Sequence, residues 1–319
     1  MAGTRTRNRV GWGGGTVVSA ATADSLDLLS YDPNPTPEDP ADLGRYVNDE
    51  LFRIRDTFYE ILDNMSSNSD MMLSIAKGDV GGHSSINKFG RNQTIANSAT
   101  EDIWDGSSSY LTTPGFPTTA VITHAWSAVN SAATQGLVIE VQGLNENWAE
   151  ATDTVTLNAA NSTTATAFDS ATTFIRVFRM RVIDSTQADQ NIQCGDSGKA
   201  NYYAQITAGE NQTQMAIYTV PANKTAYMTN YYASCNEVAA RSIEGTIKLY
   251  TIDRENNYTN QTKHVLGLDE DATSVVRHEF APYFKITQKT DIVLQFANAV
   301  AAVADVSAGF DLILVDDGY

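Results

Sequence analysis

One stretch near the start of the chain carries apolar residues in a heptad rhythm. The spacings alternate between four and three residues, at Val47, Leu51, Ile54, Phe58, Ile61 and Met65. This rhythm is typical of a helix whose apolar stripe pairs with copies of itself. It predicts an oligomerising coiled-coil helix over residues 41–76. The alternative is an amphipathic helix packed on its own domain, although the stripe of such a helix is normally wider and less regular.

Local signals indicate where this helix begins but leave the number of associated chains open. Asp39 can accept hydrogen bonds from the free amides of the first turn, and Pro40 suits the first helical position. One set of core positions in the heptads holds β-branched residues throughout, at Val47, Ile54 and Ile61. Such residues lean toward a dimer, whereas the bulky Phe58 in the other set of core positions departs from the leucine that a dimer prefers. Dimer and trimer therefore both remain open.

Residues 1–40 have no amphipathic period, and prolines recur in their second half. These features predict an extended arm rather than a folded domain. Its tip combines cationic and apolar residues, namely Arg5, Arg7, Arg9, Val10 and Trp12. Arginine and tryptophan dominate compact binding patches, so we expect this tip to anchor the chain on a partner protein. A frayed terminus is the alternative.

From about Ser84 to the end, short runs rich in Thr, Val, Ile, Tyr and Phe alternate with Gly, Asn, Asp and Ser. This composition is typical of antiparallel sheets. The predicted strands are 120–124, 137–142, 154–158, 173–183, 214–220, 225–234, 245–253, 274–280, 291–297 and 308–315. In the fourth of these, Arg179 and Arg181 alternate with apolar residues, which predicts one buried and one wet face.

Strands at this spacing without long helices between them predict β sandwiches of a jelly-roll-like kind. The polar stretch 185–198 is the best place for a boundary. The predicted fold is therefore mainly β, with an arm over 1–40, a coiled-coil helix over 41–76, and two antiparallel β-sandwich domains. These domains are expected at 77–195 and 196–319, each close to the usual domain size.

Charge and composition exclude several partners. The net charge is −17, from 38 acidic and 21 basic residues, so nucleic-acid phosphates would be repelled over most of the surface. No apolar run approaches a membrane span, and the first residues lack the apolar core of a secretory signal, which predicts a protein made and kept in a cytoplasm. In a reducing compartment Cys194 and Cys235 are expected to be separate buried thiols.

Reaction chemistry is not visible in the sequence. The histidines show no ligand spacing, at His83, His124, His264 and His278. The acidic run Asp269-Glu270-Asp271 could hold calcium, but it lacks the alternating ligands of a recognised loop, so a solvated turn is favoured. The Gly-Xaa-Ser-Xaa-Gly motif and a phosphate-binding glycine loop are both absent. We therefore expect no enzymatic activity, no cofactor and no metal.

Several runs nevertheless resemble one group of proteins. They are 82–92 (GHSSINKFGRN), 101–106 (EDIWDG), 154–158 (TVTLN), 174–180 (FIRVFRM), 215–221 (MAIYTVP) and 307–317 (SAGFDLILVDD). Together they resemble virion structural proteins of marine tailed bacteriophages over most of residues 80–319. These runs are family signatures rather than catalytic motifs.

The resemblance implies a particle component without fixing its position in the particle. The order of arm, helix and sheets is similar to phage fibres and spikes, in which a short coil unites three chains. We therefore expect a homotrimeric tail fibre or appendage, anchored through its arm to another virion protein of tail or capsid, with a host surface glycan as a further ligand. The alternative is a capsid decoration or cement protein on capsomer junctions, and the third choice is a glycan-degrading spike.

Overall fold

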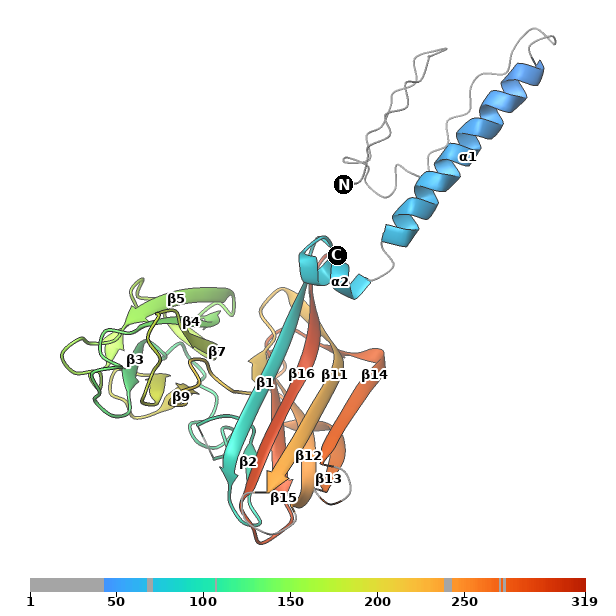
Figure 1. The fold of residues 1–319 in the computed structure, drawn as a ribbon. Coiled ribbons are helices and arrows are strands. Elements are labelled where there is room, and N and C mark those ends of the chain that lie inside the picture. Colours follow the sequence, from blue (N-terminus) through green and yellow to red (C-terminus); the bar gives the residue numbers. More distant parts are fainter. Residues whose placement is uncertain (1–42, 68–70, 107, 238–242, 270, 272–273) are drawn as a thin grey trace. The chain divides into compact units, whose positions relative to one another are not determined.

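The computed structural model describes residues 43–319 except 68–70, 107, 238–242, 270 and 272–273, and the described chain is mainly β (Figure 1). It divides into two compact units between Ser74 and Ile75, which are described separately below. The arm residues Arg5, Arg7, Arg9, Val10 and Trp12, and the expected capping residues, lie outside the described part.

Two helices occupy most of the stretch 41–76 that was predicted to be helical. Helix α1 spans Leu43–Ser67 and α2 spans Met71–Lys77, with residues 68–70 outside the described set. The polar run Ser66-Ser67-Asn68-Ser69-Asp70 explains the end of α1, because these residue types compete with the helical backbone for hydrogen bonds. After α2, Gly78 adopts a φ of 78°, which is a typical glycine conformation just past a helix end.

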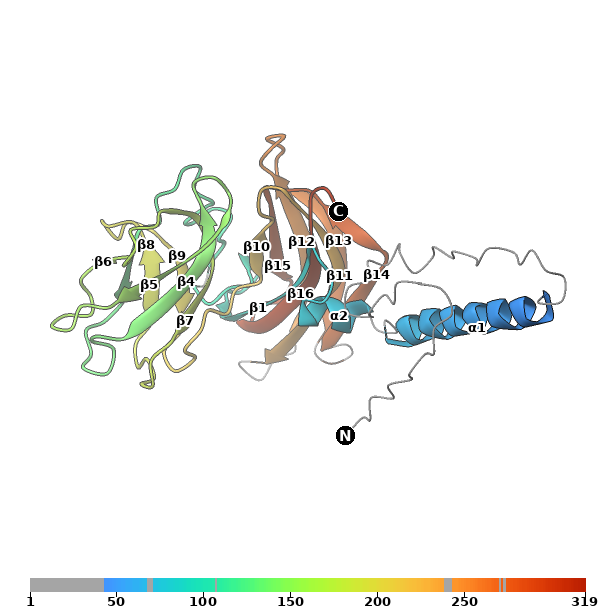
Figure 2. The same cartoon turned by 90° about the horizontal axis from the view of Figure 1, so that it is seen from above.

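The larger of two β sandwiches, called here the main sandwich, contains two antiparallel sheets (Figures 1 and 2). One sheet has the order β1-β16-β11-β14, and the other has the order β10-β15-β12-β13 with β2 paired to β15. Its strands are β1 His83–Ile95, β2 Thr100–Asp102, β10 Ile217–Thr219, β11 Lys224–Glu237, β12 Glu244–Asp253, β13 Gln261–Asp269, β14 Val275–Ile286, β15 Thr290–Asn298 and β16 Ala304–Asp316. Alternate apolar residues of both sheets, such as Phe310 and Phe296, meet in one buried core.

A second sandwich, called here the inserted sandwich, is built from residues between β2 and β10 (Figure 2). Its sheets have the orders β6-β3-β8-β9 and β5-β4-β7. Its strands are β3 His124–Ser127, β4 Val138–Asn145, β5 Glu150–Thr156, β6 Thr166–Ala167, β7 Phe174–Val182, β8 Ile192–Gly195 and β9 Tyr202–Ile206. Along β7, Arg179 and Arg181 are exposed while Met180 is buried, as the alternation predicted.

Strand pairing does not follow the predicted division into 77–195 and 196–319. That boundary falls inside one sheet, because β8 pairs with β9 across it. Strand β1, from the predicted first domain, pairs with β16 over most of its length. The polar stretch 185–198 is thus part of the inserted sandwich and not a linker. The two thiols lie in different cores, Cys194 in that of the inserted sandwich and Cys235 in that of the main sandwich.

The chain leaves the main sandwich after β2 and returns before β10, and these two crossings run side by side. The amide of Ala216 donates to the carbonyl of Ile103 at 2.9 Å, and that of Asp105 donates to the carbonyl of Gln214 at 3.0 Å. Both crossings press against Gly90 of β1, where an added Cβ would lie 2.3 Å from the amide nitrogen of Ala216. Only glycine leaves room for such a close approach of backbone.

Candidate functional site

The predicted oligomerisation residues lie on α1, and the described ones are exposed. The exposed fractions of their side chains are 47% for Val47, 59% for Leu51, 49% for Ile54 and 57% for Phe58. Ile61 and Met65 belong to the same helix, but their side chains are outside the described set. A helix that shows such a stripe to solvent has not buried its apolar face within its own chain. We call the six predicted positions the seam.

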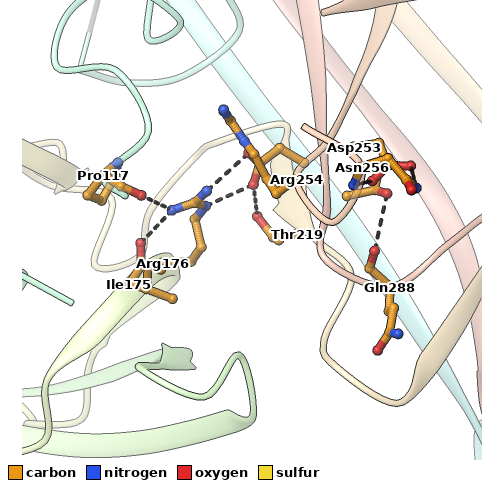
Figure 3. A network of polar contacts seen from close by, with 10 residues as sticks. Pro117, Ile175, Arg176, Thr219, Asp253, Arg254, Asn256 and Gln288 are labelled. Carbon is orange, nitrogen blue, oxygen red and sulfur yellow. Dashed lines mark hydrogen bonds and ion pairs between the residues drawn. The ribbon is translucent and has the colours of Figure 1, made fainter. Parts of the chain in front are cut away.

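A second group of functional side chains joins the inserted sandwich to the main sandwich and was not predicted from the sequence (Figure 3). Arg176 on β7 donates from Nε and Nη2 to the two carboxylate oxygens of Asp291 on β15, at 2.8 and 3.1 Å. The same carboxylate accepts from Arg254 Nε at 2.6 Å and from the Thr219 hydroxyl at 2.6 Å. Arg176 and Asp291 are 3% and 0% exposed, so this pairing is fully desolvated.

Both donors on Nη1 of Arg176 also have partners. Its Nη1 donates to the carbonyls of Pro117 and Ile175 at 2.7 and 2.8 Å (Figure 3). The guanidinium lies over the rings of Phe116 and Trp148, 4.7 and 4.8 Å from their centroids. A buried charge with this many partners positions the two sandwiches, because any displacement would leave a charge unpaired in a low dielectric.

Beside the crossings lies a polar cavity of about 190 Å³ lined by Asp105, Arg91 and Gln205, among others. Oδ2 of Asp105 accepts from the amide of Gln214 at 3.2 Å, whereas Oδ1 is buried and has no hydrogen-bond partner among the described residues. Burial raises the pKa of the Asp105 carboxyl to about 8, and hydrogen bonds together with the charge of Lys88 oppose that rise.

A second cavity of about 260 Å³ is lined by residues of β1, β4, β7 and β10. Lys88 of β1 lines it and is 8% exposed. The ammonium of Lys88 donates to the carbonyl of Phe178. The hydroxyl of Tyr218, which also lines the cavity, is buried and lacks a partner among the described residues. Burial, and then the charge of Arg179, lower the pKa of Lys88 to about 7.

Two of the four histidines come together although their sequence spacing gave no sign of it. The rings of His264 on β13 and His278 on β14 stack with centroids 4.0 Å apart, and Nδ1 of His264 lies 2.6 Å from the hydroxyl of Tyr231. In the described part of the chain no group of three His, Cys, Asp or Glu side chains is placed to hold a metal ion. Glu270 of the acidic turn lies outside that part.

Sequence reasoning missed all of these buried charges for one reason. Each of Lys88, Asp105, Arg176 and Asp291 depends on partners that are distant in sequence, so local spacing carries no signal for it. The nearest available signal was a charged residue among apolar neighbours, as with Arg176 within Phe174–Phe178. Such a residue in a buried strand requires a partner.

Comparisons with known proteins give little further guidance. No protein-family profile matches the sequence, and no curated protein matches it significantly. Among solved structures, a chain from the structure of infectious bursal disease virus, Gt strain, is similar at 11% identity and a TM-score of 0.22. The match covers 77% of this chain and 78% of that one. None of the described helices is long and apolar enough to cross a membrane.

Proposed function

We propose that this chain is a non-enzymatic structural protein of a tailed-phage virion, a homotrimeric tail fibre or appendage assembled in the host cytoplasm. In this proposal residues 1–40 attach to another virion protein, the seam of α1 joins three chains as a coiled coil, and the sandwiches project outward with host-surface binding as a further role. The trimer rests on the resemblance to phage structural proteins, since the heptads alone fit a dimer as well.

The observation that carries the proposal is the exposure of the seam. Four successive heptad positions, from Val47 to Phe58, leave about half of each apolar side chain in solvent. Phe52 and Tyr59, one heptad apart beside the seam, are also exposed, by 53% and 60%. A partner with the same periodicity would cover these side chains, and copies of the same chain provide it.

The test compares two double variants of the full chain by light scattering and circular dichroism. Replacing Ile54→Asp and Phe58→Asp would bury charges against their own copies, at a cost of several kcal/mol per contact, and should release monomers. The control Asn48→Asp with Arg55→Gln makes the same change of two charge units outside the seam and should remain trimeric. Arg55 loses an exposed pair with Asp56 and a cation–π contact with the ring of Phe52 at 4.6 Å, and such exposed contacts contribute little.

The expected mass of the wild-type assembly is three times the 34.6 kDa chain. Both variants should keep the β signal in circular dichroism, because the sandwiches have their own cores. A wild-type monomer at micromolar concentration would refute the oligomer. Full assembly of the seam variant would show that the sandwiches, and not the seam, hold the oligomer together. Counting copies per particle by electron microscopy then separates a tail appendage from a capsid decoration protein, which is present in far greater number.

A further inference from the structure

The cavity beside Lys88 brings together two cationic side chains, Lys88 and Arg179, whose hydrogen bonds in the described part of the chain go to uncharged oxygens. Lys88 donates to a main-chain carbonyl, and Arg179 donates to Oε1 of Gln212 at 3.3 Å. Within the described residues neither cation forms an ion pair with Asp or Glu. Arg181, two positions along the same strand, shows the contrast, because it holds Glu140 at 2.7 Å. In a chain of net charge −17, two neighbouring cations without a direct ion pair are a local exception.

The charged groups around Lys88 compensate its positive charge only weakly, so an anion would stabilise it. Arg179 on β7 acts on Lys88 as a like charge, and Asp105 on the outgoing crossing acts in the opposite sense. Burial also raises the pKa of Asp105, to about 8, which weakens the negative charge that this carboxyl can set against Lys88. An anion in the cavity would supply the missing charge and would raise the pKa of Lys88 again.

A third group points to the same kind of ligand. The hydroxyl of Tyr218 is buried, and it has no hydrogen-bond partner in the described part of the chain. A buried hydroxyl without a partner costs free energy, which an acceptor oxygen in the cavity would recover. Burial and the charge of Glu150 hold the pKa of Tyr218 well above its ordinary value, so this hydroxyl remains a donor.

The lining also sets the size and character of the ligand. The cavity of about 260 Å³ has room for a ring of monosaccharide size. Phe89 and Phe178 offer apolar faces, while Gln142 and Gln212 offer amide donors and acceptors. Apolar surface with a few placed polar groups is the usual make-up of a small-molecule site.

We propose that this cavity binds a carboxylate-bearing ligand of monosaccharide size, with its carboxylate held by Lys88, Arg179 and the hydroxyl of Tyr218. The sugar acids of surface polysaccharides belong to this chemical class. The proposal does not depend on the oligomeric state or on a role in a virion, because all of its residues belong to one chain.

Calorimetry of the full chain with methyl β-D-glucuronide at pH 7 tests the proposal, with the uncharged methyl β-D-glucoside as the matched ligand. The glucuronide should bind, and the glucoside at least tenfold more weakly. Arg179→Gln and Lys88→Met should each weaken the glucuronide at least tenfold. Lys285→Gln, an exposed lysine on the opposite edge strand of the same sheet, should leave its affinity unchanged.

Proton linkage gives a second readout that general loss of structure would not reproduce. At pH 8 free Lys88 is largely neutral, so binding an anion should take up about 0.8 proton if it restores the pKa above 9. Heats measured in two buffers of different ionisation enthalpy report this uptake. The Lys88→Met variant should lose most of it, and an unchanged uptake in that variant would overturn the role of Lys88.

The proposal is overturned if the glucuronide does not bind, or if the glucoside binds equally well. Unchanged affinity in Arg179→Gln would overturn it too, and that variant alters only an exposed side chain, so its folding is not in doubt. Tyr218→Phe, which removes the unpartnered hydroxyl, should keep the fold and lower the affinity three- to tenfold.

Discussion

The buried network around Asp291 makes a quantitative prediction about how the two sandwiches are held together. Replacing Asp291→Asn removes the one carboxylate that Arg176 contacts among the described residues, and it leaves that guanidinium buried without a counter-charge from them. Breaking a buried pair by removing one partner costs about 3–5 kcal/mol. We expect the upper end, about 5 kcal/mol, because Arg254 loses the same carboxylate.

The opposite replacement, Arg176→Met, should cost less. Asp291 then keeps Arg254 at 2.6 Å and the Thr219 hydroxyl at 2.6 Å, so its charge remains partly compensated. We expect the lower end, about 3 kcal/mol. The double variant should cost about 5–6 kcal/mol, well under the sum of the two, because the coupling between contacting charged groups is about 2–3 kcal/mol.

Urea unfolding followed by circular dichroism and by tryptophan fluorescence measures these values. Trp148 lies over Arg176, so its emission reports on the network itself. A matched control is the exposed pair Arg277 and Glu279, which are 3.0 Å apart with side chains 59% and 71% exposed. Removing either partner there should cost less than about 1 kcal/mol, without coupling. Additive costs at Arg176 and Asp291, or costs as small as those of the control, would refute the reasoning.

Two further predictions concern buried positions near the crossings. Asp105 has a pKa raised from 3.8 to about 8, so the folded state binds more protons than the unfolded state between these values and stability should fall as pH rises through this window. The amide in Asp105→Asn resembles the protonated carboxyl, so the free energy of unfolding of this variant should fall less steeply, by about 1.4 kcal/mol per pH unit between pH 5 and 7. Urea unfolding of both proteins at several pH values measures the two slopes, and equal slopes would contradict this prediction. Gly90→Ala would place a Cβ 2.3 Å from the backbone of Ala216 and should cost about 1–3 kcal/mol, whereas Gly267→Ala, with nothing within 4 Å, should change the thermal midpoint little. Similar midpoints for both glycine variants would show that the crossings can move aside.

The sequence allowed most strands to be located but not their arrangement. The runs predicted at 245–253 and 291–297 correspond closely to β12 and β15, because alternating apolar residues leave a local signal. Strand β1 was not predicted. Its inward positions include Lys88, Gly90 and Asn92. Lys88 donates to Phe178 of β7, Gly90 lies against the crossings, and Asn92 donates to two residues of β2. A polar buried face hides the period on which strand prediction depends.

The insertion of one sandwich into the chain of the other could not be predicted from the sequence, for a related reason. Nothing in the sequence of β1 shows that it pairs with β16, since the register that joins Ile86 to Leu312 is set by long-range packing. The seam, in contrast, was predictable as a pattern because helical spacing is local. For the candidate cavities the sequence gave no warning, since Lys88 and Asp105 acquire their properties only from segments that the fold brings beside them.

The placement of β1 beside β16 also dictates an order of events during synthesis. Strand β1 leaves the ribosome before the other described strands, but its partner β16 is made after all of them. The inserted sandwich has all its own strands in one continuous stretch and can fold while the rest is still being translated. Until β16 has been synthesised, β1 must remain an open strand edge, which is a hazard for aggregation. Its polar residues, such as Lys88 and Asn92, lower the risk of aggregation before β16 has been made, because charged and polar side chains discourage edge-to-edge pairing.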